Sequence, residues 1–84
     1  MKLSLNGALF GNACQFHNYL ANQLHFPAWY GRNLDALYDC LTDLTADTEL
    51  ELLNWPQSGT LARAKRAMQD AAAENAHLKI SVAE

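Results

Sequence analysis

Three short strand-like segments, separated by segments with helical periodicity, constrain the fold of this chain most strongly. Residues 2–5 and 77–82 alternate between apolar and polar side chains, and residues 50–53 form a third short segment rich in leucine. Two helical segments lie between the first and second strands, and one lies between the second and third. Strands joined by a crossover helix pair in parallel, with a right-handed connection. The sequence therefore predicts an α/β fold: a small three-stranded parallel sheet packed by helices, in the order β-α-α-β-α-β.

Capping residues and a proline set the expected limits of the helices. Asn12, Asn33 and Thr60 are each placed to cap a helix, because a short polar side chain can accept a hydrogen bond from a free backbone N–H. Pro27 is expected to end the first helix, since the residue before a proline is pushed out of the α region. The residues expected to face inward from the third helix are Leu61, Ala64, Met68, Ala71 and Ala72.

The second helical segment has one apolar side and one acidic side. Its apolar residues recur at spacings of three and four and are Leu34, Leu37, Tyr38, Leu41 and Leu44. On the other side Asp35, Asp39 and Asp43 follow one another at i, i+4 spacing, where like charges repel by roughly 0.2–0.5 kcal/mol per pair in an isolated helix. A sequence selected only for stability would place Lys or Arg among them. The acidic side therefore has the pattern of a surface that meets a positively charged partner.

Charge is distributed unevenly along the 84 residues, although the net charge is only −3. Residues 33–62 contain six acids and no Lys or Arg, whereas residues 1–31 carry the single charge of Lys2. Binding of nucleic acid needs a basic surface, so nucleic acid is not expected as a direct ligand. A basic protein is the favoured partner. The length fits one domain, residues 1–84, and no segment approaches the roughly 20 apolar residues of a membrane span.

Catalytic and metal sites are weakly supported by the sequence. Asp35 and Asp39 could form an acid–base pair, but on the outer side of a helix no cleft would exclude water from them. A solvated acidic face without function and a partner-binding face both fit these residues better than an acid–base pair does. The three histidines form no pair with ligand spacing, so no metal and no cofactor are expected. Cys14 and Cys40 are too few for a disulfide framework, and both are expected to be reduced thiols of a cytoplasmic protein.

The segment before the acidic helix is unusually aromatic. Trp29 and Tyr30 lie in a loop next to the acidic residues, a composition typical of the central residues of protein interfaces, although Trp29 also fits a core position. Phe26 and Trp55 are expected in the core. Tyr38 lies at the edge of the apolar stripe and fits either the core or the rim of an interface.

Residues 26–42, FPAWYGRNLDALYDCLT, resemble the signature loop and helix of the barstar family of ribonuclease inhibitors. The similarity extends to Leu5-Asn6-Gly7 at the first strand and to the closing helix and strand, with a shorter connection near Gly59. It implies a single barstar-like domain with the strand and helix order given above. It also implies a function, which is the inhibition of a secreted, basic, barnase-like ribonuclease inside the cell that produces it. Such a protein is an inhibitor and not an enzyme.

The resemblance also implies which residues contact the ribonuclease. Asp39 matches the acid that occupies the phosphate position of the nuclease, and Asp70 is the nearest match to an acid late in the last helix. Asn33 at the helix cap and Asp43, which extends the negative field, complete the candidate set. The other residues that the resemblance places in the interface are Trp29, Gly31, Leu34, Asp35 and Tyr38.

Four positions depart from the pattern of the best-known family member. Trp29 stands in place of a tyrosine, and Tyr38 stands in place of a tryptophan. Arg32 replaces an acid, so the loop is less negative, and Asp70 is one methylene shorter than the expected glutamate. These departures concern the identity of the partner rather than the fold. The alternative function is a barstar-like binding or immunity module for a different basic protein or toxin.

Overall fold

The chain has the predicted order of strands and helices, with one short 3-10 helix in addition. The structure is a computed structural model, and it describes residues 1–83. The 3-10 helix η1 (Gly7–Leu9) directly follows the first strand. The elements are β1 (Lys2–Asn6), η1 (Gly7–Leu9), α1 (Ala13–Leu24), α2 (Leu34–Thr42), β2 (Thr48–Leu53), α3 (Gly59–Glu74) and β3 (Leu78–Ala83).

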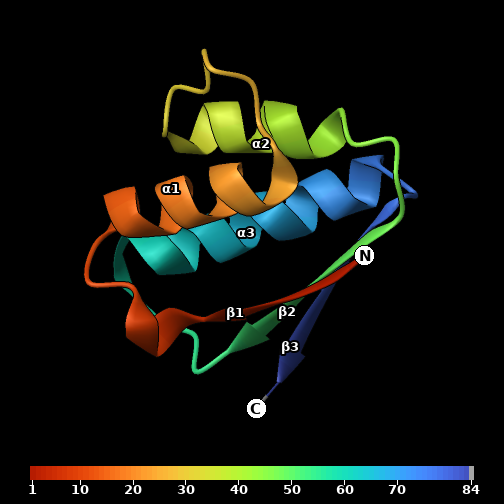
Figure 1. Ribbon diagram of the computed structural model, residues 1–84. Coiled ribbons are helices and arrows are strands. Elements are labelled where there is room, and N and C mark those ends of the chain that lie inside the picture. Colours follow the sequence, from red (N-terminus) through yellow and green to blue (C-terminus); the bar gives the residue numbers. More distant parts are fainter. Residues whose placement is uncertain (84) are drawn as a thin grey trace.

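The three strands form one parallel sheet in the order β1-β2-β3. In register, Leu3 of β1 lies opposite Leu50 of β2, and Leu50 lies opposite Ile80 of β3. All three helices lie on one face of the sheet, and the loop between α1 and α2 is on the side of the molecule away from the strands (Figure 1). The predicted α/β fold is therefore confirmed, with the two helices between β1 and β2 and the one between β2 and β3 covering the same face.

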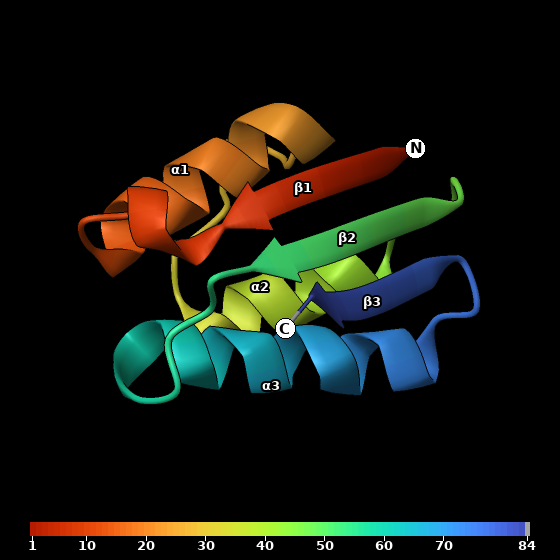
Figure 2. The same ribbon diagram turned by 90° about the horizontal axis from the view of Figure 1, so that it is seen from below.

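No helix within residues 1–83 covers the other face of the sheet (Figure 2). Parallel sheets are usually covered on both faces and then have continuously apolar strands. Here alternate residues are polar: Lys2 Nζ lies 3.8 Å from a carboxylate oxygen of Glu49, and the Ser4 hydroxyl donates to Glu51 over 3.0 Å. The alternation that identifies these strands in the sequence thus reflects a sheet with one face packed against the helices and the other face exposed to solvent.

The core lies between the sheet and the helices. Each helix contributes residues at three- and four-residue spacing, and each strand contributes alternate residues. The residues inaccessible to solvent include Leu5, Leu50 and Leu52 from the sheet, Phe16 and Leu20 from α1, Leu37 and Leu41 from α2, and Ala64, Met68 and Ala71 from α3. Within residues 1–83, no helix is long and apolar enough to cross a membrane.

Several element boundaries differ from the predictions. The prediction that Thr60 caps α3 was wrong: Ser58 is at the cap position, and Gly59 begins the helix with a φ of +83°, which glycine adopts without steric cost. The strand β2 begins at Thr48, two residues earlier than predicted, because the Thr48 N–H donates to the His77 carbonyl over 2.7 Å. The cap predicted at Asn12 is confirmed, since its side chain accepts a hydrogen bond from the Gln15 N–H.

Asn75, which the sequence analysis did not single out, connects the carboxyl ends of α2 and α3. Its side-chain amide is buried and donates to the carbonyl oxygens of Leu41, Thr42 and Leu44 at 3.0, 3.3 and 2.9 Å. The last carbonyls of a helix have no partner within the helix. Asn75 satisfies those of α2 from another element, so it fixes the end of α2 against α3.

We expect the substitution Asn75→Ala to destabilise the fold by about 1–3 kcal/mol, because it removes the buried amide that donates to the carbonyls of Leu41, Thr42 and Leu44, of which, among the described residues, only that of Leu41 also accepts from the Leu44 N–H. Urea denaturation of the wild type and the variant measures the difference. Asn22→Ala, at an exposed position of α1, is the control and should leave the free energy of unfolding nearly unchanged. An unchanged midpoint for Asn75→Ala would show that water or a backbone shift replaces these hydrogen bonds.

Candidate functional site

The helix α2 presents its acidic side outward because its apolar side is packed in the core. Leu37 and Leu41 are completely buried, whereas Asp35 and Asp39 are exposed. The cap predicted at Asn33 is confirmed: its side-chain oxygen accepts a hydrogen bond from the Ala36 N–H at 2.8 Å. Asp35 lies in the first turn, where the helix dipole favours a negative charge.

Asp35, Asp39 and Asp43, which we call the acidic face, have exposed side chains. In the part of the chain that the structure describes, both ion pairs lie at the strands and neither includes a residue of the acidic face. Three carboxylates are therefore held on one side of a short segment without a cation inside the protein. This arrangement leaves their full charge available to a positively charged partner.

Asp43 differs from the other two residues of the acidic face in its backbone position. The helix ends at Thr42, and Asp43 is its C-cap, with its N–H donating to the Asp39 carbonyl over 3.2 Å. A negative charge at the carboxyl end of a helix is disfavoured by the helix dipole. The negative charge of Asp43 at this position therefore destabilises the free protein.

The two aromatic residues of the loop have opposite environments. The Trp29 side chain is 69% exposed, whereas Tyr30 is 3% exposed and belongs to the core. The exposure of Trp29 excludes the core position that its sequence context left open. The suggestion that Tyr30 shares a surface role with Trp29 was wrong, because its ring packs against Phe26 and His17.

Two polar contacts, one buried and one exposed, hold the loop against α1. The Tyr30 hydroxyl is hydrogen-bonded to Nδ1 of the buried His17, and Arg32 Nε donates to the side-chain oxygen of Asn18. Burial raises the pKa of Tyr30 well above its usual value. Burial also lowers the pKa of His17, and the nearby charge of Arg32 lowers it further. The loop that carries Trp29 is thus anchored to α1 through Tyr30 and Arg32, which follow Trp29 in the chain.

Gly31 allows the loop to approach the start of α2 closely. A Cβ atom at this position would lie 2.9 Å from Nδ2 of Asn33, whose amide donates to the Gly31 carbonyl at 3.4 Å. Any larger residue would therefore displace the side chain that caps α2. Gly31 and Asn33 support the candidate surface by their geometry, whether or not a partner touches them.

Leu34 and Tyr38 lie at the border between the acidic face and the core. Both are half-buried and pack against core residues, so each has an exposed part next to the carboxylates. Phe26 and Trp55, expected in the core, are also half-buried against it, and Trp55 Nε1 donates to the Leu61 carbonyl over 2.7 Å. Tyr38 is thus half-buried against the core, with part of its ring exposed, which fits both of the alternatives given for it.

Asp70 is exposed on α3, the helix whose end is tied to α2 by Asn75. Its side chain lines an open hollow of about 490 Å³ together with Pro56, Lys65 and Arg66. None of the other predicted site residues lines that hollow. The structure thus brings eight of the nine predicted residues together around the loop and α2, and places Asp70 on a neighbouring helix beside cationic residues.

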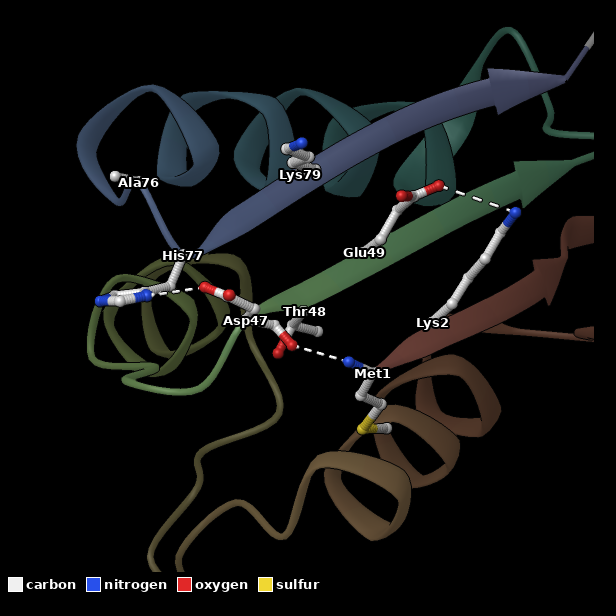
Figure 3. Close-up of a pocket in the computed structure, with 8 residues that line it drawn as sticks. All are labelled: Met1, Lys2, Asp47, Thr48, Glu49, Ala76, His77 and Lys79. Atoms are coloured by element: carbon white, nitrogen blue, oxygen red, sulfur yellow. Dashed lines mark hydrogen bonds and ion pairs between the residues drawn. The ribbon is translucent and has the colours of Figure 1, made fainter.

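Another hollow lies at the amino ends of the strands (Figure 3). It has a volume of about 510 Å³, and in it His77 Nδ1 lies 2.9 Å from an Asp47 carboxylate oxygen. The hydrogen bond from His77 lowers the pKa of Asp47. No predicted site residue lines this hollow, and the residues described include no group of three or more side chains placed to hold a metal ion.

The sequence analysis missed the side chains that support the loop. The sequence does give one signal for His17, because this residue falls beside Phe16 on the buried side of α1, but its partner Tyr30 lies 13 residues away.

Cys40 is a free, buried thiol whose pKa is raised by burial and by the charges of Asp43 and Asp39. Cys14 is also free and is exposed, so the expectation that the two cysteines do not pair is confirmed.

We expect Asp39→Ala to leave the free protein as stable as the wild type or more stable by roughly 0.4–1 kcal/mol, because it removes two like-charge pairs. No hydrogen bond to the Asp39 carboxylate is present among residues 1–83, so no native contact is lost. Chemical denaturation of the wild type and of variants at Asp35, Asp39 and Asp43 measures the effect. A clearly lower midpoint for Asp39→Ala would mean that this carboxylate stabilises the fold.

We expect stability to fall as the pH is lowered below the ordinary histidine value of 6.5. His17 has a lowered pKa in the folded protein, so the unfolded chain takes up the proton first. This contribution is fully present above pH 6.5 and is lost as the pH falls toward the folded pKa. Denaturation at several pH values between 8 and 5 measures it. His17→Gln should flatten the dependence and exposed His25→Gln should retain it; equal slopes in all three proteins would contradict the assignment.

Comparison with known proteins agrees with the resemblance found in the signature segment. A protein of Bacillus subtilis strain 168 named "Putative ribonuclease inhibitor YrdF" is 51% identical over 41 residues, which are 49% of this chain and 45% of that protein. The matched segment thus spans slightly less than half of that relative. The family model of barstar, the barnase inhibitor, matches residues 1–79. Because this match covers nearly the whole chain, the chain belongs to the barstar (barnase inhibitor) family.

Proposed function

We propose that this protein inhibits a basic, barnase-like ribonuclease by covering its active site with the acidic face and Trp29. The observation that carries the proposal is a set of three exposed carboxylates without internal cations, next to an exposed tryptophan whose loop is anchored to α1. Family membership and the name of the Bacillus relative support a ribonuclease as the partner. The details of the contact rest on physical argument.

Asp39 is the central residue of the proposed mechanism. A ribonuclease holds Arg, Lys and His side chains where the scissile phosphate of RNA binds. The Asp39 carboxylate, projecting from α2, would take the place of that phosphate and accept charge-assisted hydrogen bonds from guanidinium groups. The helix is held at both ends, by the Asn33 cap and by Asn75, so little order has to be gained on binding.

The remaining surface residues would add attraction and buried area. Asp35 and Asp43 extend the negative field, which speeds the encounter with a basic protein. Trp29 supplies a large apolar surface, and the exposed edges of Leu34 and Tyr38 adjoin it. Asp70 would contribute only if the ribonuclease also reaches α3.

In this mechanism no covalent bond is made or broken, so the protein acts as an inhibitor and not as an enzyme. Its place would be the cytoplasm, where it protects the producing cell from the ribonuclease before secretion. Inhibition then requires only that binding be tight and that it exclude RNA.

The proposal is tested by titrating the protein against several small, basic microbial ribonucleases while RNA cleavage is followed. We expect stoichiometric inhibition of at least one of them, relieved by excess RNA. Inhibition that RNA does not relieve would contradict occlusion of the active site. Binding to none of the ribonucleases, together with capture of another basic protein or toxin, would favour the alternative function of a binding module with a different target.

The same assay with Asp39→Ala tests the central residue. We expect binding to weaken by several kcal/mol. This magnitude is taken from the barnase–barstar complex, where truncation of one aspartate has an effect of that size. Glu51→Gln is the matched control, because it removes one negative charge from the face of the sheet opposite the helices. Equal effects of the two substitutions would contradict a specific role of Asp39.

A further inference from the structure

A small hollow lies between the end of α1, the loop and the carboxyl end of α2. Its volume is about 170 Å³. Liquid water occupies about 30 Å³ per molecule, so the hollow corresponds to roughly six waters, whereas pockets for small-molecule ligands usually exceed about 300 Å³. Its size fits one long side chain. Its apolar lining consists of Leu24, Phe26, Pro27, Trp29 and Leu44.

The polar groups of this hollow make it a place for a cation. Asp43 lines it, and its carboxylate is exposed and has no ion pair among residues 1–83. Cys40 also lines it, and the charges of Asp43 and Asp39 both contribute to raising the pKa of its thiol, so the negative field of the acidic face extends into the hollow. The dipole of α2 disfavours a carboxylate at the C-cap, which an incoming cation would offset.

The lining distinguishes between the two long cationic side chains. Trp29, which has an exposed indole, and Asp43 both line the hollow, together with several apolar side chains. A guanidinium group is planar, is weakly hydrated, stacks on aromatic rings and binds a carboxylate through two parallel hydrogen bonds. An ammonium group is compact and strongly hydrated, so it gains less in an apolar hollow.

We propose that this hollow receives an arginine side chain of the ribonuclease, with its stem against the apolar lining and its guanidinium between Trp29 and the Asp43 carboxylate. The inference rests on the proposed function and adds to it a second cation-binding position, separate from that of Asp39. Asp43 then holds the bound ribonuclease in place rather than only attracting it from a distance.

Association and dissociation rates separate the two roles of Asp43. If it holds an arginine, Asp43→Asn raises the dissociation rate by about 10-fold or more, and the change persists at high salt because the pair is shielded from water. If it acts only through its field, the substitution lowers the association rate at low salt and leaves dissociation unchanged, which would overturn the inference. Glu51→Gln is the control for the loss of one charge and should change neither rate at high salt.

Double-mutant cycles identify the arginine. Each arginine of the inhibited ribonuclease is replaced by lysine, and its binding to wild type, Asp43→Asn and Trp29→Ala is measured. We expect one arginine to show coupling of about 10-fold or more with Asp43 and a measurable coupling with Trp29. The absence of any arginine coupled to both residues would overturn the inference. Both substituted residues are exposed, so the variants should keep the fold.

Cys40 provides a readout inside the hollow. In a Cys14→Ser background it is the remaining thiol of the chain, and its reaction with a small alkylating reagent can be followed by mass spectrometry. Saturating wild-type ribonuclease should slow this reaction more than saturating ribonuclease in which the coupled arginine is replaced by alanine. Equal protection by both would contradict occupancy of the hollow. If no ribonuclease binds at all, the proposed function fails together with this inference; binding with an unchanged dissociation rate for Asp43→Asn overturns the inference alone.

Discussion

The burial of one side of α2 is the constraint on which the candidate site depends. Leu37 and Leu41 are completely inaccessible to solvent, so the helix cannot rotate about its axis without exposing them. Asp35 and Asp39, on the opposite side, are therefore held outward. The hydrogen bonds from Asn75 to the last carbonyls of α2 fix its position along the axis as well. A carboxylate on such a helix is already oriented before a partner arrives, which lowers the entropic cost of binding.

The loop before α2 is ordered by contacts that lie behind the surface it presents. Tyr30 points inward to His17, and Arg32 reaches back to Asn18 of α1, whereas Trp29, next to Tyr30 in the chain, is exposed to solvent. Because the Trp29 side chain is exposed, its packing within the protein contributes little to the stability of the fold. Its neighbours on the surface are carboxylates, and aromatic and charged groups in this combination characterise interfaces.

Stability and binding make opposite demands on the acidic face. Like charges at i, i+4 repel, and Asp43 stands at the end of α2 where the helix dipole opposes it. The structure compensates elsewhere, with a continuous core and with well-placed caps at Asn12 and Asn33. The hollow beside Trp29 is a further example of stability given up for binding. Its carboxylate, that of Asp43, has no ion pair among the described residues and is therefore free to pair with a basic partner.

The sequence alone determined the order of the elements, the side of α2 that faces the core and the family of the chain. These depend on periodicity and caps within single segments and on the motif of residues 26–42, all of which are local. The same signals located Asp35, Asp39 and Asp43 on one surface. Boundaries were less accurate where pairing between strands decided them, as at Thr48.

Only the tertiary structure decided which of Trp29 and Tyr30 is buried, because adjacent residues of an irregular loop have no periodicity to distinguish them. It also decided the contact of His17 with Tyr30 over 13 residues and that of Asn75 with Leu41 over 34. The hollow beside Trp29 is likewise formed by three segments, none of which contains a pattern for it. Local sequence specifies the direction of a side chain within a helix or strand, whereas contacts between distant segments exist only after the chain has packed.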